Sequence, residues 1–345
     1  MNEMNEMNGT GIRLRELNFE LLKAVLKVYP GGVTKQFLAE KTGLSLATCG
    51  TLVTELVKTG EVLESARSAS GGGRPPRLYT YNNTYAMSAL LHPAVENGVR
   101  ILTCCVADAA GRIIWRESHS PGVIDFGTLA GALATAAERF PVRAAAVSFP
   151  GPVRNGLPAS RELPELDGQN LTGRLQERFG FAVCLDNDMN FAAAGYYNRF
   201  VRHAEKSLCY LSFPPGRYPG GGIIVDGRLT RGFSGFAGEV SFLSFGISRG
   251  QQALRLANRN GLIGQLVDTL AALAAVMNPE IVVLAGDLPE ESMREPVMKL
   301  SRELIPAEHL PALVFRGDPL DDCLFGMSLA AQELLTPPVR LVRRR

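Results

Sequence analysis

The pattern of apolar and polar positions changes once along this chain and divides it into two parts. Over residues 12–29, apolar side chains recur at the spacing of one helix face, which predicts a first helix. From residue 99 onward, short apolar runs rich in small and β-branched residues alternate with helical patterns. Such alternation predicts helices that cover a largely central sheet, and its length suggests two lobes with a cleft between them.

Residues 33–59 carry two further helical patterns that are separated by a glycine. We expect Gly43 to end the first helix, because glycine adopts the left-handed conformation of a helix C-terminus. Ser45 can cap the second helix, since its hydroxyl can accept from the free backbone N–H groups there. Apolar residues on one face of the second helix are Leu46, Val53, Leu56 and Val57. Two helices joined by a tight glycine turn predict a helix-turn-helix.

A predicted hairpin with a basic loop follows these helices. Residues 61–65 and 77–81 have the pattern of short strands, and the link over 66–77 holds three arginines, three consecutive glycines and no acidic residue. Inserted arginine is attracted to a narrow minor groove, and small polar side chains at the start of the second helix can approach phosphates and base edges. The pattern therefore predicts a winged helix-turn-helix that binds double-stranded DNA. The residues expected at the DNA are Ser45, Ala47, Thr48, Thr51, Arg67, Arg74 and Arg77. The alternative is a helical hairpin with a loose loop that contacts only protein.

Composition limits the kinds of protein that this chain can be. Its 345 residues suffice for two or three domains, and 46% hydrophobic with 20% charged residues describes a globular protein. The net charge of +2 means that any nucleic-acid contact comes from a local basic patch. No apolar run is long enough for a membrane span, and residues 1–11 form a polar repeat that we expect to be disordered, not a secretory signal. Six scattered cysteines without a C-x-x-C pair predict a reducing, cytoplasmic location and no cysteine-based zinc site.

Four segments of the second part carry a family resemblance. They are SFPGPV at 148–153, DNDMNFAAAGYY at 186–197, GFSGFAGEV at 232–240 and NPEIVVLAGD at 278–287. Together with GGGRP in the predicted wing, they resemble the ROK family, named for repressors, open reading frames and sugar kinases. The resemblance implies an α/β fold in which an N-terminal winged helix-turn-helix precedes a two-lobed actin/hexokinase-like body. The domains implied are a tail over 1–11, a DNA-binding domain over 12–82 and the body over 83–345.

The resemblance also suggests residues for a sugar site. Asp188 matches the aspartate that acts as base on a sugar hydroxyl in the family's kinases, and a carboxylate within reach of a hydroxyl can accept its proton. Asn187 and Glu239 match sugar-binding positions, and Glu162 stands where the family has a sugar-contacting asparagine. The alternative for Asp188 is a structural role as the N-terminal cap of the helix that follows it.

The chain departs from the family where the kinases bind phosphate and zinc. The first phosphate loop corresponds to residues 96–100, where its aspartate and threonine are missing. The second corresponds to residues 216–220, where Arg217 and Tyr218 replace small residues and Pro219 removes an N–H donor. Phe242 stands in place of a zinc-ligand histidine, and the family's cysteines are absent from this segment.

We interpret the altered phosphate and zinc motifs as evidence that the chain is not a kinase. We expect a DNA-binding transcription regulator, in particular a repressor, that has no catalytic activity and binds no cofactor or metal. The body would then serve for dimerisation, as a homodimer or higher oligomer on a near-palindromic operator, and for sensing a sugar or sugar phosphate. Its cleft would include Asn187, Asp188, Glu239 and Glu162. Two alternatives stay open: a sugar kinase that retains weak activity, with Asp188 as its base, and an interaction protein that binds neither ligand nor DNA.

Overall fold

The computed structural model describes residues 2–66, 77–160, 162–201 and 206–335. The chain divides into two compact units: residues 1–87 with 107–112 and 335–345 form the first, and residues 88–106 with 113–334 form the second. Each unit has its own buried apolar core.

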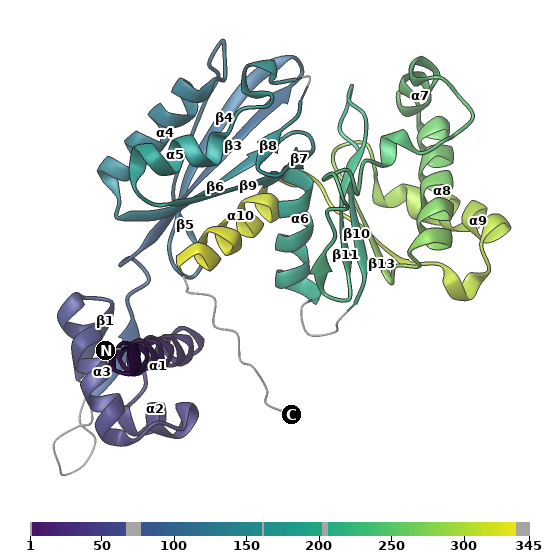
Figure 1. The fold of residues 1–345 in the computed structure, drawn as a ribbon. Helices are drawn as coiled ribbons and strands as arrows, with labels where there is room; N and C mark the ends of the chain where they lie inside the picture. The colour runs from purple at the N-terminus through teal and green to yellow at the C-terminus, as the bar shows by residue number, and fades with distance from the viewer. Residues whose placement is uncertain (1, 67–76, 161, 202–205, 336–345) are drawn as a thin grey trace. The chain divides into compact units, whose positions relative to one another are not determined.

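The first unit contains three helices and a two-stranded hairpin (Figure 1). These elements are α1 (Asn2–Val28), α2 (Lys35–Thr42), α3 (Leu46–Thr59), β1 (Val62–Ala66) and β2 (Arg77–Tyr81). The strands are antiparallel, with Val62 opposite Tyr81 and Ala66 opposite Arg77. The second and third helices and the two strands therefore lie where the sequence predicted them.

The turn between α2 and α3 has the expected caps. Gly43 takes a left-handed conformation with φ of 74° at the end of α2, and its N–H donates to the carbonyl of Ala39. The Ser45 hydroxyl accepts from the N–H of Thr48 at the start of α3. Both predictions from the sequence are confirmed.

Two expectations for this unit differ from the structure. α1 begins at Asn2, so it includes most of the segment predicted as a disordered tail, and the methionines and glutamates of that segment are good helix formers. Leu46 was assigned to the buried face of α3, but its side chain is 58% exposed because it lies at the first turn of that helix. The predicted Val53 and Leu56 are buried and Val57 packs against the core, which also receives Cys49 and Leu52.

The first lobe of the second unit is a five-stranded mixed sheet in the order β5-β4-β3-β6-β9. The strands are β3 (Met87–Glu96), β4 (Val99–Ala107), β5 (Ile113–His119), β6 (Val142–Phe149) and β9 (Ala182–Asn187). The helices of this lobe are α4 (Phe126–Arg139) and α5 (Leu171–Phe179), and a short hairpin is formed by β7 (Val153–Arg154) and β8 (Leu157–Pro158). The sequence did not predict β3. An Asn97-Gly98 turn with positive φ at both residues joins it to β4.

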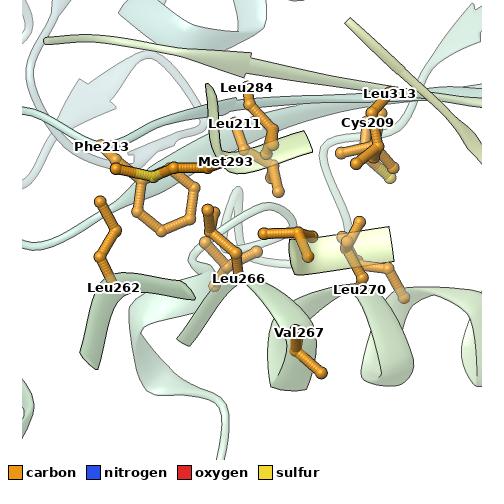
Figure 2. Packing of buried hydrophobic residues seen from close by; sticks show 14 of the residues in the cluster. Cys209, Leu211, Phe213, Leu262, Leu266, Val267, Leu270, Leu284, Met293 and Leu313 are labelled. Carbon is orange, nitrogen blue, oxygen red and sulfur yellow. The ribbon is translucent and has the colours of Figure 1, made fainter. Parts of the chain in front are cut away.

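The second lobe repeats this architecture with the order β12-β11-β10-β13-β14. Its strands are β10 (Leu208–Ser212), β11 (Gly220–Val225), β12 (Arg228–Leu229), β13 (Ile281–Ala285) and β14 (Ala312–Phe315). Its helices are α7 (Arg249–Leu256), α8 (Arg259–Val276) and α9 (Arg294–Leu304). Figure 2 shows how apolar side chains of the sheet, such as Leu211 and Leu284, pack against Leu262, Leu266 and Leu270 of α8. The predicted two-lobed α/β body is confirmed.

Two helices connect the lobes: α6 (Asp188–Tyr196) runs from β9 towards the second sheet, and α10 (Leu320–Leu335) follows β14 (Figure 1). They cross in direct backbone contact. A Cβ on Gly195 would lie 1.9 Å from the carbonyl oxygen of Asp322, and one on Gly326 would lie 1.9 Å from that of Phe191. No residue larger than glycine fits at either position without separating the helices.

We expect Gly326→Ala to destabilise the second unit by about 1–3 kcal/mol or more, because the added methyl overlaps backbone that cannot move aside cheaply. Urea unfolding followed by circular dichroism measures this difference. Gly131→Ala in α4 is the matched control, since a Cβ there meets open space and alanine favours a helix by up to about 1 kcal/mol. Equal unfolding midpoints for the two variants would show that the helices do not depend on this contact.

Candidate functional site

A cleft of about 420 Å³ lies in the second unit and is lined by residues of both lobes. Its volume is in the range of pockets that hold small molecules, about 300–1,000 Å³. The four residues that the sequence predicted for a ligand site all line it: Glu162, Asn187, Asp188 and Glu239. Chain segments that are distant in sequence therefore meet in one cleft.

Asn187 and Asp188 stand where β9 ends and α6 begins, and they have different tasks. The Asn187 side chain is the N-cap of α6, because its Oδ1 accepts from the N–H groups of Met189 and Asn190 at 2.8 and 3.2 Å. Its Nδ2 donates to the carbonyl of Gly151 at 3.0 Å. The N-cap role that was considered for Asp188 therefore belongs to Asn187, whose amide is largely engaged by backbone. Asp188 is the first helical residue and keeps its second carboxylate oxygen available to the cleft.

The environment of Asp188 favours its protonated form. Burial raises the pKa of this carboxyl to about 7, and the neighbouring Arg217 and the N–H of Met189 oppose the shift. The negative charges of Glu239 and Glu162 add to the increase in the pKa. Burial also raises the pKa of Glu239, against the effect of Arg249. Asp188 can thus exchange a proton near neutral pH, and both carboxyl groups can form hydrogen bonds with a hydroxyl.

A bidentate ion pair spans the cleft between the lobes. Arg217, in the loop between β10 and β11, donates from Nε and Nη2 to the carboxylate oxygens of Glu162 at 3.0 and 2.8 Å. Both side chains are about one-third exposed, so solvent screens the pair in part, but its fork geometry gives it direction. Arg217 and Glu162, two positions that the resemblance assigned to phosphate and sugar contacts, therefore bind each other.

The second arginine of the cleft is engaged as well. Arg249 donates from Nη1 to the carbonyl of Ser241 at 2.6 Å and to Oε1 of Gln252 at 3.1 Å. Its guanidinium lies 3.8 Å from the ring centre of Tyr218 and 4.6 Å from that of Phe242. Phe242, where the family resemblance implies a metal-ligand histidine, packs its ring against this guanidinium. Within the described ranges, no group of three or more His, Cys, Asp or Glu side chains could hold a metal ion.

Sequence reasoning missed a polar cluster beside Asp188. His92 of β3 shares a hydrogen bond of 2.7 Å with the hydroxyl of Ser148, and the Cys323 thiol of α10 lies 3.9 Å from the same ring nitrogen. Burial, together with the charges of Arg116 and Arg217, lowers the pKa of His92 to about 4, so the ring is neutral. A lone histidine in a strand that the sequence did not predict gave no local signal for this cluster.

The predicted DNA-contacting residues of the first unit are only partly available. The Ser45 and Thr48 hydroxyls lie 2.8 Å apart and bind each other at the α3 N-terminus. Ala47 and Thr51 are exposed.

Arg77 is exposed and forms an ion pair with Glu64 across the hairpin. Arg67 and Arg74 lie outside the described residues. Thr54 and Lys58, which the sequence reading did not name, extend the exposed face of α3.

In the described part of the chain, none of the helices has the length and apolar character needed to cross a membrane.

Comparison with known proteins gives consistent similarities. The ROK family model matches residues 93–251. A xylose repressor from Bacillus spizizenii is 28% identical over 238 residues, which cover 65% of this chain and 59% of the repressor, so the chain spans less than two thirds of that relative. The structure of a ROK family transcriptional regulator, described as a homologue of the Escherichia coli MLC protein, matches with a TM-score of 0.64 at 16% identity and covers 93% of this chain and 98% of the regulator. A ROK hexokinase from Thermus thermophilus matches with a TM-score of 0.55 at 21% identity over 72% of this chain and 99% of the hexokinase.

The raised pKa of Asp188 has a consequence for stability. Its folded-state pKa of about 7 lies above the ordinary value of 3.8, so the folded protein binds a proton that the unfolded chain releases over the interval between them. The contribution of Asp188 to the free energy of unfolding therefore falls as pH rises from about 4 to about 7, and it is constant at higher pH. We expect Asp188→Asn to be more stable than the parent at pH 8, with a difference that shrinks as pH decreases to about 4. Urea unfolding at four pH values measures it, and a difference that does not change with pH would contradict the assigned environment.

Proposed function

We propose that this chain, which the ROK family model matches over residues 93–251, is a transcription repressor that binds DNA through its first unit and a small sugar in the cleft of its second unit. The observation that carries the proposal is the first unit itself, a helix-turn-helix with a strand hairpin. A sugar kinase needs no such unit for phosphoryl transfer.

The first unit fits the geometry of a winged helix-turn-helix. In such a domain α3 would lie in the major groove, and the loop between β1 and β2 would reach the backbone or the minor groove. Gly43 ends α2 and Ser45 caps α3, so the turn between the two helices is short and α3 keeps an exposed face. Two copies in a homodimer would contact half-sites separated by about 34 Å or a multiple of it, on a near-palindromic operator. Chromosomal DNA as partner implies action in the cytoplasm.

The charges of the cleft favour an unphosphorylated sugar over a sugar phosphate. Acidic lining residues outnumber basic ones; they are Glu96, Glu162, Asp188, Glu239, Asp287 and Asp318, against Arg217 and Arg249. Both arginines are already hydrogen-bonded to protein groups. A phosphate would thus enter a negative site without a free guanidinium, whereas hydroxyl groups can donate to Asp188 and Glu239. The name of the Bacillus relative adds a pentose, xylose, to the sugars worth testing.

A sugar kinase is the second candidate, and Asp188 is the observation that favours it. A carboxyl with a pKa of about 7 is suited to act as a general base on a hydroxyl. The positions for phosphate oppose this function. Pro219 has no N–H to offer, and Arg217 is bound to Glu162, so neither positions a transferring phosphoryl group. We therefore favour a regulator without enzymatic activity.

Selection of genomic DNA fragments on the full-length protein tests the proposed function. We expect a near-palindromic sequence to be enriched, and its affinity to decrease steeply with salt because arginine and lysine contacts release counterions from DNA. The double variant Arg74→Ala, Arg77→Ala should bind the enriched sequence at least several-fold more weakly. Lys299→Ala, which removes an exposed charge from α9 of the second unit, is the matched control. If the parent protein enriches no sequence at any salt concentration, the proposed function is wrong.

A further inference from the structure

Helix α3 presents one narrow stripe of residues to solvent. Ala47, Thr51, Thr54 and Lys58 follow one another at spacings of four, three and four residues, which places them on a single helix face, and all four are exposed. The buried residues of α3 lie on the opposite face. In the proposed DNA complex, this stripe is the surface that faces the bases.

The side-chain hydrogen-bond donors along the first turns of this surface are used within the helix. The hydroxyl of Thr51 donates to the carbonyl of Ala47 at 3.2 Å, and that of Thr54 donates to the carbonyl of Gly50 at 2.7 Å. The hydroxyls of Ser45 and Thr48 bind each other at the helix start. Arginine and lysine, which recognise guanine, and asparagine and glutamine, which recognise adenine, are absent from α3 ahead of Lys58.

The acidic residue beside the stripe is also engaged. Glu55 could accept a hydrogen bond from the amino group of cytosine, but its two carboxylate oxygens accept from Nη2 of Arg15 in α1 at 2.6 and 2.7 Å. Over its first two turns, α3 therefore offers methyl groups and hydroxyl oxygens to a ligand, and no free charged side chain.

An exposed leucine adds to this apolar surface. Leu46 is 58% exposed at the first turn of α3, next to Ala47, and is not part of the core of the first unit. Recognition helices contact base edges with their N-terminal residues. In the major groove, the 5-methyl group of thymine is the apolar feature of the base edges, and alanine and threonine methyl groups are suited to contact it.

We propose that α3 selects its operator through thymine 5-methyl groups, which contact Leu46, Ala47 and the methyl groups of Thr51 and Thr54. The inference rests on the proposed function, since it concerns how the same helix reads DNA. The half-site bases beneath the first turns of α3 are then thymines, and discrimination against cytosine or guanine comes from lost apolar contact. Lys58 lies about one turn beyond Thr54 on the same face.

Replacement of thymine by uracil in the enriched operator tests this inference directly. Uracil lacks the methyl group but keeps base pairing and the minor-groove edge, so contacts of the hairpin are unchanged. We expect each contacted position to lose about fourfold in affinity, the effect of one buried methyl group, measured by fluorescence anisotropy with one substitution at a time.

Two conservative variants identify the protein side of the contact. Thr51→Ser and Thr54→Ser each keep the hydroxyl that donates to the helix backbone and remove only the methyl group. Each variant should bind the thymine operator more weakly than the parent. In each variant, uracil at the position that the lost methyl group contacted should cause no further loss of affinity. Thr59→Ser is the matched control, because Thr59 also donates to a helix carbonyl but lies off the stripe at the end of α3.

The outcomes separate the two proposals. If the protein binds its enriched operator and uracil has no effect at any position, the inference is wrong and the proposed function stands. If uracil weakens binding equally in the parent, Thr51→Ser and Thr54→Ser, the assignment to these threonines is wrong. If no operator is enriched, the proposed function fails and the inference with it.

Discussion

The backbone contact between α6 and α10 is the constraint on which the two-lobed unit depends. Gly195 and Gly326 allow the two helices to touch, and each helix begins at the cleft. Asp188 is the first residue of α6, and Cys323 lies in the first turn of α10, so the two helices that cross also place side chains in the cleft. The helix crossing and the cleft therefore share these two helices.

The cleft combines a kinase-like arrangement with charges that do not suit phosphate. The raised pKa of Asp188 would suit a base, whereas Arg217 and Glu162 form an ion pair with each other, at positions where the family resemblance implies phosphate and sugar contacts. The pair joins the two lobes directly, so a ligand that competed for either side chain would remove a contact between them.

Local sequence signals predicted local structure well. Gly43 and Ser45 fixed the turn between α2 and α3 because glycine at a C-terminus and serine at an N-terminus act through their own backbone neighbours. The prediction for Leu46 was wrong because helical spacing alone does not show where a helix leaves the core. The strand β3 was missed, and with it the contact of His92 with Ser148, since these residues are 56 positions apart. The pair of Arg217 with Glu162 and the helix crossing likewise join distant segments, and no periodicity in the sequence encodes them.

The most direct measurement of the link between cleft and DNA is the affinity of the full-length protein for its operator during titration with sugars. Xylose, glucose and glucose 6-phosphate form a suitable first set. We expect an unphosphorylated sugar to change operator affinity at least several-fold, an effect that Glu239→Gln abolishes and that Glu177→Gln, an exposed substitution on α5, leaves intact. A response to the phosphorylated sugar alone, or one that persists in Glu239→Gln, would contradict the role assigned to the cleft.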